Sequence, residues 1–268
     1  MGKDTIMFAV LGDIHGHFDT AWCALDDALH TCGVPAGRLD AIFAVGDVEP
    51  LRSVDEMGQV HGPAKYRELG CFVDVVKGTI TFPAPLYFIG GNHEPWPSLD
   101  ADGGLARHGG AWAPGVTFLG RAGLLEVAGL QVAFLSGIHS PVVSRLPAAD
   151  RPLPAAPKKD LKRRTYWVDA ELDAVRKAGR RGRVDLLLTH DWPAGIGVDR
   201  AQNPTGCEHV RSLVEAVQPT VSCHGHMHHR HSAAIGDTAV CCLGHIRSGT
   251  DAVGVFARHA DGTIDRLH

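Results

Sequence analysis

Five short motifs of the sequence place Asp, Asn or His directly after an apolar run. They are Gly12-Asp13-Ile14-His15-Gly16, Gly46-Asp47, Gly91-Asn92-His93-Glu94, Thr189-His190-Asp191 and Gly225-His226-Met227-His228. Carboxylate, amide and imidazole groups are ligands for Mn²⁺, iron and Zn²⁺, and the lack of a thiolate among them argues against a structural zinc site. Two Asp, one Asn and four His of these motifs are too many ligands for one ion. A carboxylate that bridges two ions would use them economically, so the motifs favour a binuclear metal centre.

These motifs act together only if the fold brings them to one place. Continuous apolar runs at Ile6–Leu11, Ala41–Val45 and Leu86–Ile89 predict buried strands that end in Gly-Asp or Gly-Gly-Asn. Between them, Phe18–Cys32 and Ala64–Val76 have apolar residues at helical spacing. Strands that alternate with helices are typical of βαβ units and a mainly parallel sheet. Because the carboxyl ends of parallel strands share one edge, we expect the motifs to converge there.

The second half of the chain predicts a different pattern. Short strands separated by Gly turns, at Val116–Leu119, Leu124–Val127 and Gln131–Leu135, indicate an antiparallel meander. The predicted elements that follow are a helix at Val168–Lys177, a strand at Val184–Thr189, a helix near Glu208–Val217 and several short strands. Two packed sheets flanked by helices fit this order. The sequence contains no repeat or linker, which favours a single domain over residues 1–268.

Composition excludes several classes of protein. The 268 residues are 44% hydrophobic and 21% charged, as in ordinary globular proteins. The net charge of −4 argues against a molecule that binds nucleic acid through its overall charge. No apolar run approaches the roughly 18 residues that span a bilayer, so we expect no membrane association. The seven cysteines form no C-x-x-C pair and the N-terminus has no signal-peptide pattern, which predicts free thiols in the cytoplasm.

In their order and residue types, the five motifs resemble those of the calcineurin-like metallophosphoesterases. Further segments are similar to the RNA lariat debranching enzymes: Pro63–Arg67, Gly90–Glu94, Gly110–Pro114 with the strand end Leu119-Gly120, Leu135–Ile138 and Thr189–Pro193. The resemblance runs from about Val10 to His231. It implies an α/β fold, a four-layer α/β/β/α sandwich of two packed mixed sheets, and hydrolysis of a phosphoester.

The resemblance also implies a role for each motif residue. Asp13, His15, Asp47 and His228 would hold one ion, and Asp47, Asn92, His190 and His226 would hold the second. Asp47 would bridge the two ions, for which Mn²⁺ is expected, with Fe²⁺ and Zn²⁺ as alternatives. His93 would face the scissile phosphate, stabilising its charge or protonating the leaving oxygen. Hydroxide between the ions would be the in-line nucleophile, because two cations lower the pKa of the water that they bind.

Residues around the motifs are candidates for contact with the substrate: His17, Glu49, His139, Lys162, Arg163, Arg164 and Trp192. Four of them, His139, Lys162, Arg163 and Arg164, belong to a basic loop insertion at about residues 138–167, which corresponds to the family's recognition loop and also contains Lys158 and Lys159. Basic residues there would contact phosphates, and the alternative interpretation is a solvated loop and helix face. Trp192 would either stack on a base or pack in the core.

Two positions differ from the eukaryotic debranching enzymes. Those enzymes commonly have Cys in place of Asp13, so the carboxylate of this chain favours occupancy of both metal sites. They usually have Gln in place of Glu49, whose negative charge would repel a phosphate-rich substrate. From the resemblance as a whole we expect a phosphodiesterase that acts on RNA or a nucleotide, with a 2′,5′ linkage as one option.

A phosphomonoesterase of small molecules or nucleotides is the alternative function. Protein Ser/Thr phosphatases continue the second motif as Asp-Arg-Gly, whereas this chain has Asp47-Val48-Glu49-Pro50, which disfavours them. A binding module without catalysis is disfavoured because every expected ligand and His93 are present. The sequence indicates no protein partner.

Overall fold

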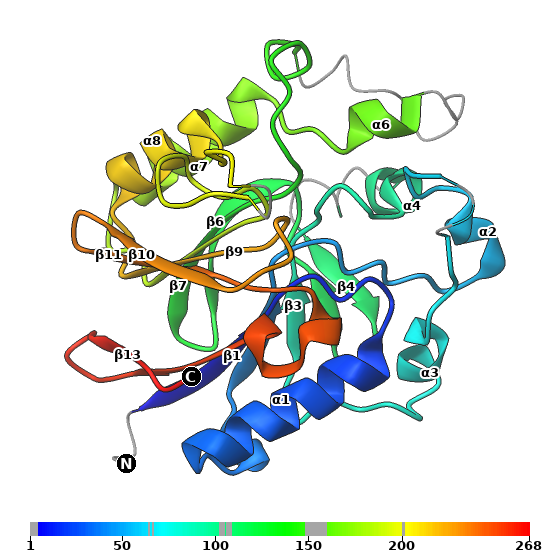
Figure 1. Ribbon diagram of the computed structural model, residues 1–268, viewed down its shortest axis with the longest axis horizontal. Helices are drawn as coiled ribbons and strands as arrows, with labels where there is room; N and C mark the ends of the chain where they lie inside the picture. The colour runs from blue at the N-terminus through cyan, green and yellow to red at the C-terminus, as the bar shows by residue number, and fades with distance from the viewer. Residues whose placement is uncertain are drawn as a thin grey trace.

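The computed structural model describes residues 5–63, 65, 67–101, 105, 109–147, 160–199 and 202–268. Within these ranges the strands form one sheet of seven strands and one of six, with helices on the outer faces (Figure 1). None of the helices in the described part of the chain is both long and apolar enough to cross a bilayer.

The first sheet has the strand order β13-β12-β1-β2-β3-β5-β4. Its strands are β1 (Ile6–Leu11), β2 (Ala41–Ala44), β3 (Leu86–Phe88), β4 (Gly110–Ala113), β5 (Val116–Phe118), β12 (Val253–Arg258) and β13 (Ile264–Arg266). Strands β1, β2, β3 and β5 are parallel, whereas β12 pairs antiparallel with β1. The predicted parallel arrangement of the first three apolar runs is confirmed.

The second sheet has the strand order β10-β11-β9-β8-β7-β6. Its strands are β6 (Ala122–Val127), β7 (Leu130–Leu135), β8 (Leu186–Thr189), β9 (Val221–His224), β10 (His231–Ile235) and β11 (Thr238–Cys242). Strands β7, β8, β9 and β11 are parallel, and antiparallel strands close both edges. Both sheets are therefore mixed.

The helices vary widely in length. They are α1 (Phe18–Cys32), α2 (Val54–Met57), α3 (Phe72–Val76), α4 (Trp96–Ala101), α6 (Leu161–Arg164), α7 (Asp169–Gly179) and α8 (Glu208–Val217), with the 3-10 helices η1 (Ala36–Arg38) and η5 (Ile246–Ala252). Helix α1 buries a stripe that includes Phe18, Leu25 and Leu29, and it ends at Gly33, whose φ of 66° suits glycine.

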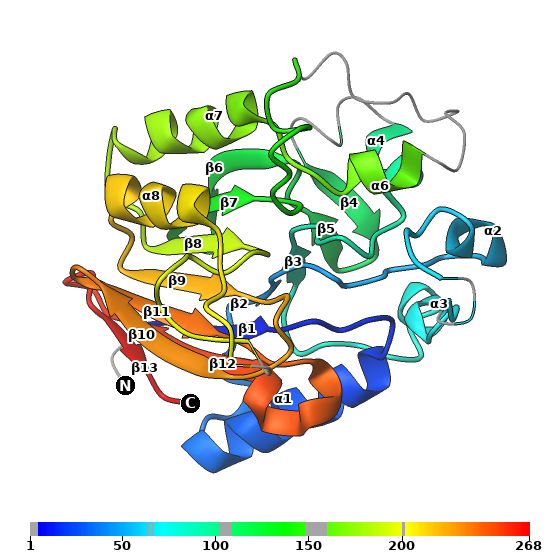
Figure 2. The ribbon, with the colours of Figure 1, turned by 45° about the horizontal axis from the view of Figure 1, so that its top comes forward.

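Three apolar clusters hold the layers together. Alternate residues of β1 point to opposite faces of the sheet, so Met7 and Ala9 pack with α1 while Phe8 and Val10 pack against the second sheet. Helices α7 and α8 cover the other face of the second sheet (Figure 2). The expected four-layer α/β/β/α sandwich is confirmed.

The predicted antiparallel meander is wrong. Strand β5 pairs parallel with β3 in the first sheet, whereas β6 and β7 form an antiparallel hairpin in the second. The chain crosses between the sheets at residues 119–121. Strand periodicity shows which residues are buried but not which sheet a short strand joins, so the crossing has no signature in the sequence.

The predicted helix at Ala64–Val76 is mostly wrong, because the described helix is only α3. Gly70 interrupts it with a φ of 66°, and a Cβ there would collide with the carbonyl oxygen of Gly16. The amide of Cys71 donates to that same carbonyl at 2.9 Å, so the chain turns here to brace the first motif. Ala64 and Tyr66 lie outside the described residues, as do Lys158, Lys159 and much of the predicted basic loop.

Candidate metal centre

The predicted metal ligands lie just beyond the carboxyl ends of parallel strands from both sheets. Asp13, Asp47 and Asn92 follow β1, β2 and β3 of the first sheet, and His190 follows β8 of the second. His226 and His228 follow β9. The two sheets stack face to face, and a Cβ on Gly46 would lie within 3 Å of the ring of His190. Glycine at this position allows the strand ends of the two sheets to approach so closely.

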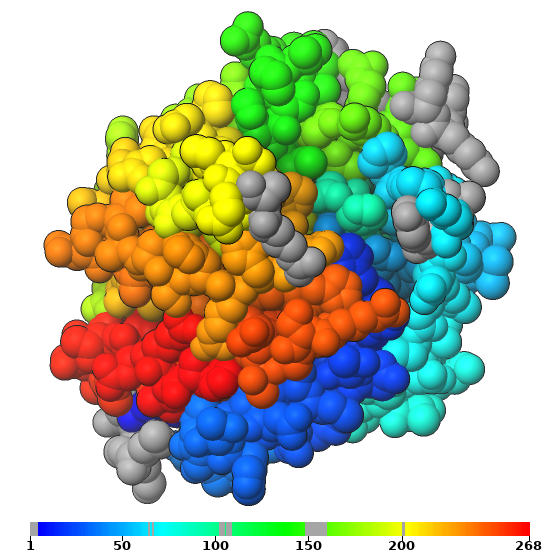
Figure 3. Space-filling model, viewed as in Figure 1, coloured from blue at the N-terminus to red at the C-terminus, as the bar shows by residue number. Residues whose placement is uncertain are grey.

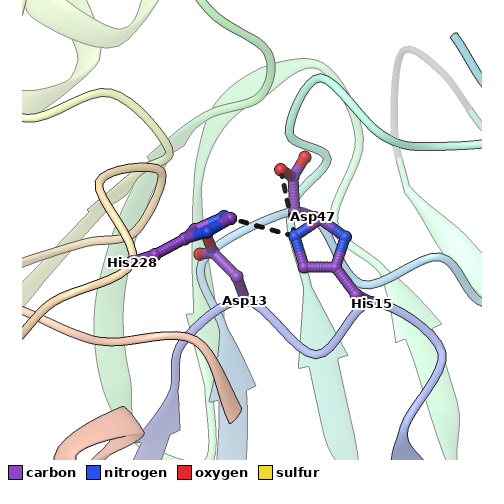
Figure 4. A group of neighbouring side chains, drawn as sticks. All are labelled: Asp13, His15, Asp47 and His228. Carbon is purple, nitrogen blue, oxygen red and sulfur yellow. Dashed lines mark hydrogen bonds and ion pairs between the residues drawn. The ribbon is translucent and has the colours of Figure 1, made fainter. Parts of the chain in front are cut away.

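The first ligand group consists of Asp13, His15, Asp47 and His228, whose ligand atoms all lie within 4.8 Å of one another. Figure 4 shows the four side chains pointing toward a common point. Nε2 of His228 lies 3.1 Å from Oδ2 of Asp13 and 3.4 Å from Nε2 of His15. Carboxylate oxygens and imidazole nitrogens that converge in this way fit a divalent cation.

The second ligand group consists of Asp47, His190 and His226, again within 4.8 Å. Nδ1 of His190 donates to the carbonyl oxygen of Val45 at 2.8 Å, which leaves Nε2 as the free ligand atom. Oδ1 of Asn92 is buried without a hydrogen-bond partner, and Nε2 of His190 is buried with the carboxylate of Asp47 beside it, 3.3 Å from Oδ2. Buried ligand atoms around a shared carboxylate fit a second cation, since a buried polar atom without a partner is costly.

The surplus of negative charge in this centre is visible in the pKa values of its imidazoles. Burial lowers the pKa of His15, but the hydrogen bond with Glu49 and the charge of Asp47 raise it to about 9. Burial likewise lowers the pKa of His190, and the charge and hydrogen bond of Asp47 raise it to about 10. Protons therefore compete with metal ions for these nitrogens.

Two glutamates support the ligands without joining either group. Oε1 of Glu49 accepts a hydrogen bond from Nδ1 of His15 at 2.7 Å, so this predicted substrate contact orients a ligand. The fully buried Glu94 accepts the amides of Val48 at 2.8 Å, Glu49 at 3.0 Å and Gly91 at 3.2 Å. It ties the loop after β2 to the loop after β3. Burial and the nearby charge of Asp47 raise the pKa of Glu94 to about 8.

Backbone strain concentrates at the same place. Eight described non-glycine residues have a positive φ, and five of them belong to the metal centre: His15, Asp47, Glu49, His226 and His228. Each such conformation costs on the order of 1–3 kcal/mol, and strained residues cluster at functional sites. The strained backbone at these residues lowers the stability of the fold and orients their side chains toward the centre.

His93 faces an open pocket of about 350 Å³ beside the first ligand group. The pocket is lined by His15, His17, Glu49, Glu68, His93, His228, His245 and Arg247. These residues come from distant parts of the chain, and the blue, cyan and orange segments meet on the face seen in Figure 3. The His93 side chain is 34% exposed, while its amide donates to Oδ1 of Asp47 at 2.7 Å. A partly exposed imidazole anchored beside the shared carboxylate is placed to meet a substrate.

The predicted substrate contacts divide in the structure. His17 lines the pocket, and Lys162 and Arg163 are exposed on α6. Burial lowers the pKa of His61, and the charges of His93 and Lys162 lower it further. His139 does not line the pocket. Its ring packs on Trp167 and His209, and its amide donates to Asp191 at 2.7 Å.

Two of the predicted contacts are corrected by burial. Trp192 is 0% exposed and its ring stacks on His231 with centroids 5.6 Å apart, so it packs in the core and offers no face to a base. Arg164 is 1% exposed and forms an ion pair with Asp100 at 3.3 Å, beneath the surface of α6. Trp192 was a candidate because it follows a motif, and Arg164 because it lies in the basic loop. Neither position in the sequence indicates the direction in which the side chain points.

Three pocket residues were missed by the sequence interpretation: Glu68, His245 and Arg247. His245 carried a usable signal, because Leu243-Gly244-His245 follows the apolar strand β11 just as the other motifs follow theirs. Arg247 is exposed and forms no ion pair with any residue that the structure describes. Nothing in the local pattern distinguishes Glu68 or Arg247 from ordinary surface charges.

Comparison with known proteins agrees with this geometry. The family model of the calcineurin-like phosphoesterases matches residues 6–230. The lariat debranching enzyme of Drosophila melanogaster is 27% identical over 253 residues, covering 85% of this chain and 45% of the relative. That of Caenorhabditis briggsae is 30% identical over 203 residues, covering 73% and 38%. That of Entamoeba histolytica is 24% identical and covers 89% and 68%. The chain thus spans less than half the length of the first two relatives.

Solved structures share the fold at low identity. One has a TM-score of 0.56 with 14% identity and covers 98% of both chains. GAP50, the anchor in the inner membrane complex of Plasmodium, has a TM-score of 0.53 with 12% identity and covers 98% of this chain and 84% of its own. The solved structures share the fold, and the match over residues 6–230 shows that the chain belongs to the calcineurin-like phosphoesterase family.

Proposed function

We propose that this chain hydrolyses a phosphodiester of RNA or of a nucleotide at a centre of two divalent ions, with Mn²⁺ as the favoured metal. The observation that carries the proposal is the sharing of Asp47 by two ligand groups next to the exposed ring of His93. Asp13, His15, Asp47 and His228 would hold one ion, and Asp47, Asn92, His190 and His226 the other. When bound, the two ions supply a lowered pKa for water and charge neutralisation on phosphate oxygens.

The chain's own groups determine where the phosphate sits. His93 lines the pocket, and its ring would stabilise the charge of the scissile phosphate or donate a proton to the leaving oxygen. The backbone amide of His93 donates a hydrogen bond to Oδ1 of Asp47, which ties the position of His93 to that of the shared ligand. Glu49 lies 3.9 Å from Nδ1 of His93, and so the same carboxylate adjoins the proton donor and orients His15.

The pocket also has a cation in its lining. Arg247 lines it and is exposed, and Lys162 is exposed on α6. A diester with flanking phosphates would offer these cations contacts that a small monoester lacks. The names of the curated relatives favour RNA with a 2′,5′ linkage as the first substrate to test.

Three substrates test the proposal: a synthetic 2′,5′-branched RNA, its linear 3′,5′ counterpart, and p-nitrophenyl phosphate, each incubated with Mn²⁺-loaded protein. Cleavage of the branched RNA or of both RNAs supports a phosphodiesterase, and selectivity for the branch specifies the linkage. Hydrolysis of the monoester alone would replace the proposal with the phosphomonoesterase alternative.

We also propose a single domain over residues 1–268 and a cytoplasmic location. The location is supported by the seven cysteines, all of which are free thiols, as expected in a reducing compartment.

A further inference from the structure

His245 follows β11 and joins the ends of the two sheets. It forms an isolated parallel bridge with Asp13, which follows β1 of the other sheet. The amide of Ile246 donates to the carbonyl oxygen of Asp13 at 2.9 Å. His245 is therefore fixed by its backbone to the first metal ligand of the chain, although the two residues are far apart in sequence.

The ring of His245 contacts both imidazoles of the first ligand group. It lies parallel to His15, with ring centroids 4.9 Å apart and an angle of 11° between the planes. It meets His228 edge to face, with centroids 5.1 Å apart and an angle of 77°. His245 itself is outside both groups of converging ligand atoms, so it contacts the ligands without being one.

A hydrogen bond fixes the ring of His245 in turn. Its Nδ1 accepts the amide of Arg247 at 3.0 Å, and thereby caps the start of η5. This hydrogen bond to the first turn of η5 fixes the orientation of the His245 ring, which stacks on His15. Glu49 holds His15 at Nδ1, and Nε2 of the same ring lies 3.4 Å from Nε2 of His228. The stacked ring of His245 adds a contact that restrains the plane of the His15 ring.

We propose that His245 is a positioning residue of the first metal site, which acts through its stacked ring on His15 and His228. Glu49 fixes one atom of His15 and His245 fixes the plane of its ring, so that Nε2 stays directed at the cation. Outer groups that hydrogen-bond to metal ligands are worth about 10- to 100-fold in metal affinity, and we expect a stacked ring to contribute at the lower end of that range. The inference rests on the proposed two-metal centre but not on any substrate.

Two substitutions separate the stacking of His245 from its role as a cap. His245→Asn keeps an acceptor for the amide of Arg247, because Asn is a good N-cap, but it removes the ring. His245→Phe keeps a ring for stacking and removes the acceptor. His30→Asn, on the exposed last turn of α1, is the matched control for the loss of an imidazole.

The experiment is a calorimetric titration of chelator-treated protein with Mn²⁺ alone, repeated with electron paramagnetic resonance to follow formation of the coupled Mn²⁺ pair. The proposal predicts that His245→Asn weakens one of two sites by about tenfold. The coupled signal then forms only at higher Mn²⁺, while His245→Phe and His30→Asn stay within about threefold of wild type. Thermal unfolding of the chelated proteins verifies that each variant is folded.

If His245→Asn bound Mn²⁺ with the affinity of wild type at both sites, the proposal would be overturned, whatever the result for His245→Phe. Equal weakening in His245→Asn and His245→Phe would also overturn it, since a stacked ring would then be insufficient. Fewer than two ions on the wild-type protein would instead contradict the two-metal centre of the proposed function. The variant comparison at the remaining site would still test His245.

Discussion

Oδ2 of Asp47 lies 3.3 Å from Nε2 of His190, although the two residues follow strands of different sheets. The same oxygen lies 3.6 Å from Nε2 of His15, on the other side of the centre. One buried carboxylate oxygen is therefore common to both ligand groups. Asp13 differs from Asp47, because its carboxylate is a ligand atom of the first group alone and reaches the second group only through the backbone amide of His226, at 3.0 and 3.1 Å.

Asp47→Asn is expected to weaken the binding of both ions, because it removes the charge of the shared ligand. Asp13→Asn should weaken one site only. Each effect should be at least the 10- to 100-fold that loss of an outer contact costs. Metal content after dialysis at limiting Mn²⁺ measures both, and one ion retained by Asp47→Asn at wild-type affinity would contradict the bridge.

Glu49→Ala is expected to lower the Mn²⁺ affinity by about tenfold, because His15 loses the carboxylate that holds its Nδ1. Glu49→Gln keeps an acceptor and should lose less. Calorimetric titration with Mn²⁺ compares the two variants. If Glu49→Ala kept its metal and only bound RNA more tightly, the expectation of charge repulsion at this position would be correct and the supporting role would not.

Arg247→Ala is expected to raise KM for an RNA substrate several-fold and leave kcat nearly unchanged, since Arg247 lines the pocket away from His93. The dependence of log KM on log salt should lose about one unit of slope, as for one phosphate contact. Arg38→Ala, at an exposed site on η1, is the matched control. A fall in kcat with unchanged KM would contradict a role in binding alone.

His224 predicts how stability depends on pH. It is fully buried between Ser222 and Thr189, and burial lowers its pKa to about 3. In the unfolded chain His224 binds a proton with a pKa near 6.5, whereas in the folded chain it stays neutral. The free energy of unfolding therefore decreases as the pH falls below 6.5. Between pH 7 and pH 5 this group alone should cost about 2 kcal/mol.

Urea unfolding of chelated wild type and His224→Gln at both pH values tests that prediction. The variant is less stable at pH 7 because it loses hydrogen bonds in the core. Its stability should nevertheless fall less between pH 7 and pH 5 than that of wild type. An equal fall in both proteins would show that His224 has the same pKa in the folded and unfolded chains, and would contradict the prediction.

The sequence predicted the layers and the convergence of the ligands because both follow from short-range rules. An apolar run followed by Gly and a polar residue predicts a buried strand end, and the ends after β1, β2 and β3 met this rule. Strand β8 is apolar but leads to His190 without a glycine, and β9 precedes Gly225 but is not an apolar run. The sheet that a short strand joins is decided by distant contacts, so β5 and β6 were wrongly assigned to one meander.

Side-chain direction was the other limit of the sequence. Trp192 follows a ligand motif and Arg164 follows a basic pair, yet both point into the core. Their neighbours in sequence do not encode which face of the turn they occupy. His245, in contrast, obeyed the strand-end rule after β11, and reading every such end would have found it.

The most direct test of the account is the turnover of the 2′,5′-branched RNA, whose leaving ribose oxygen needs a proton, by Mn²⁺-loaded wild type and His93→Ala, with bound Mn²⁺ counted in the same samples. His93 is proposed to contact the substrate and not the metal. The hydrogen bond from its backbone amide to Asp47 is kept when the side chain is removed. The account predicts two Mn²⁺ on both proteins and a kcat about 10²- to 10⁴-fold lower in the variant. A kcat near that of wild type with both ions bound would contradict it.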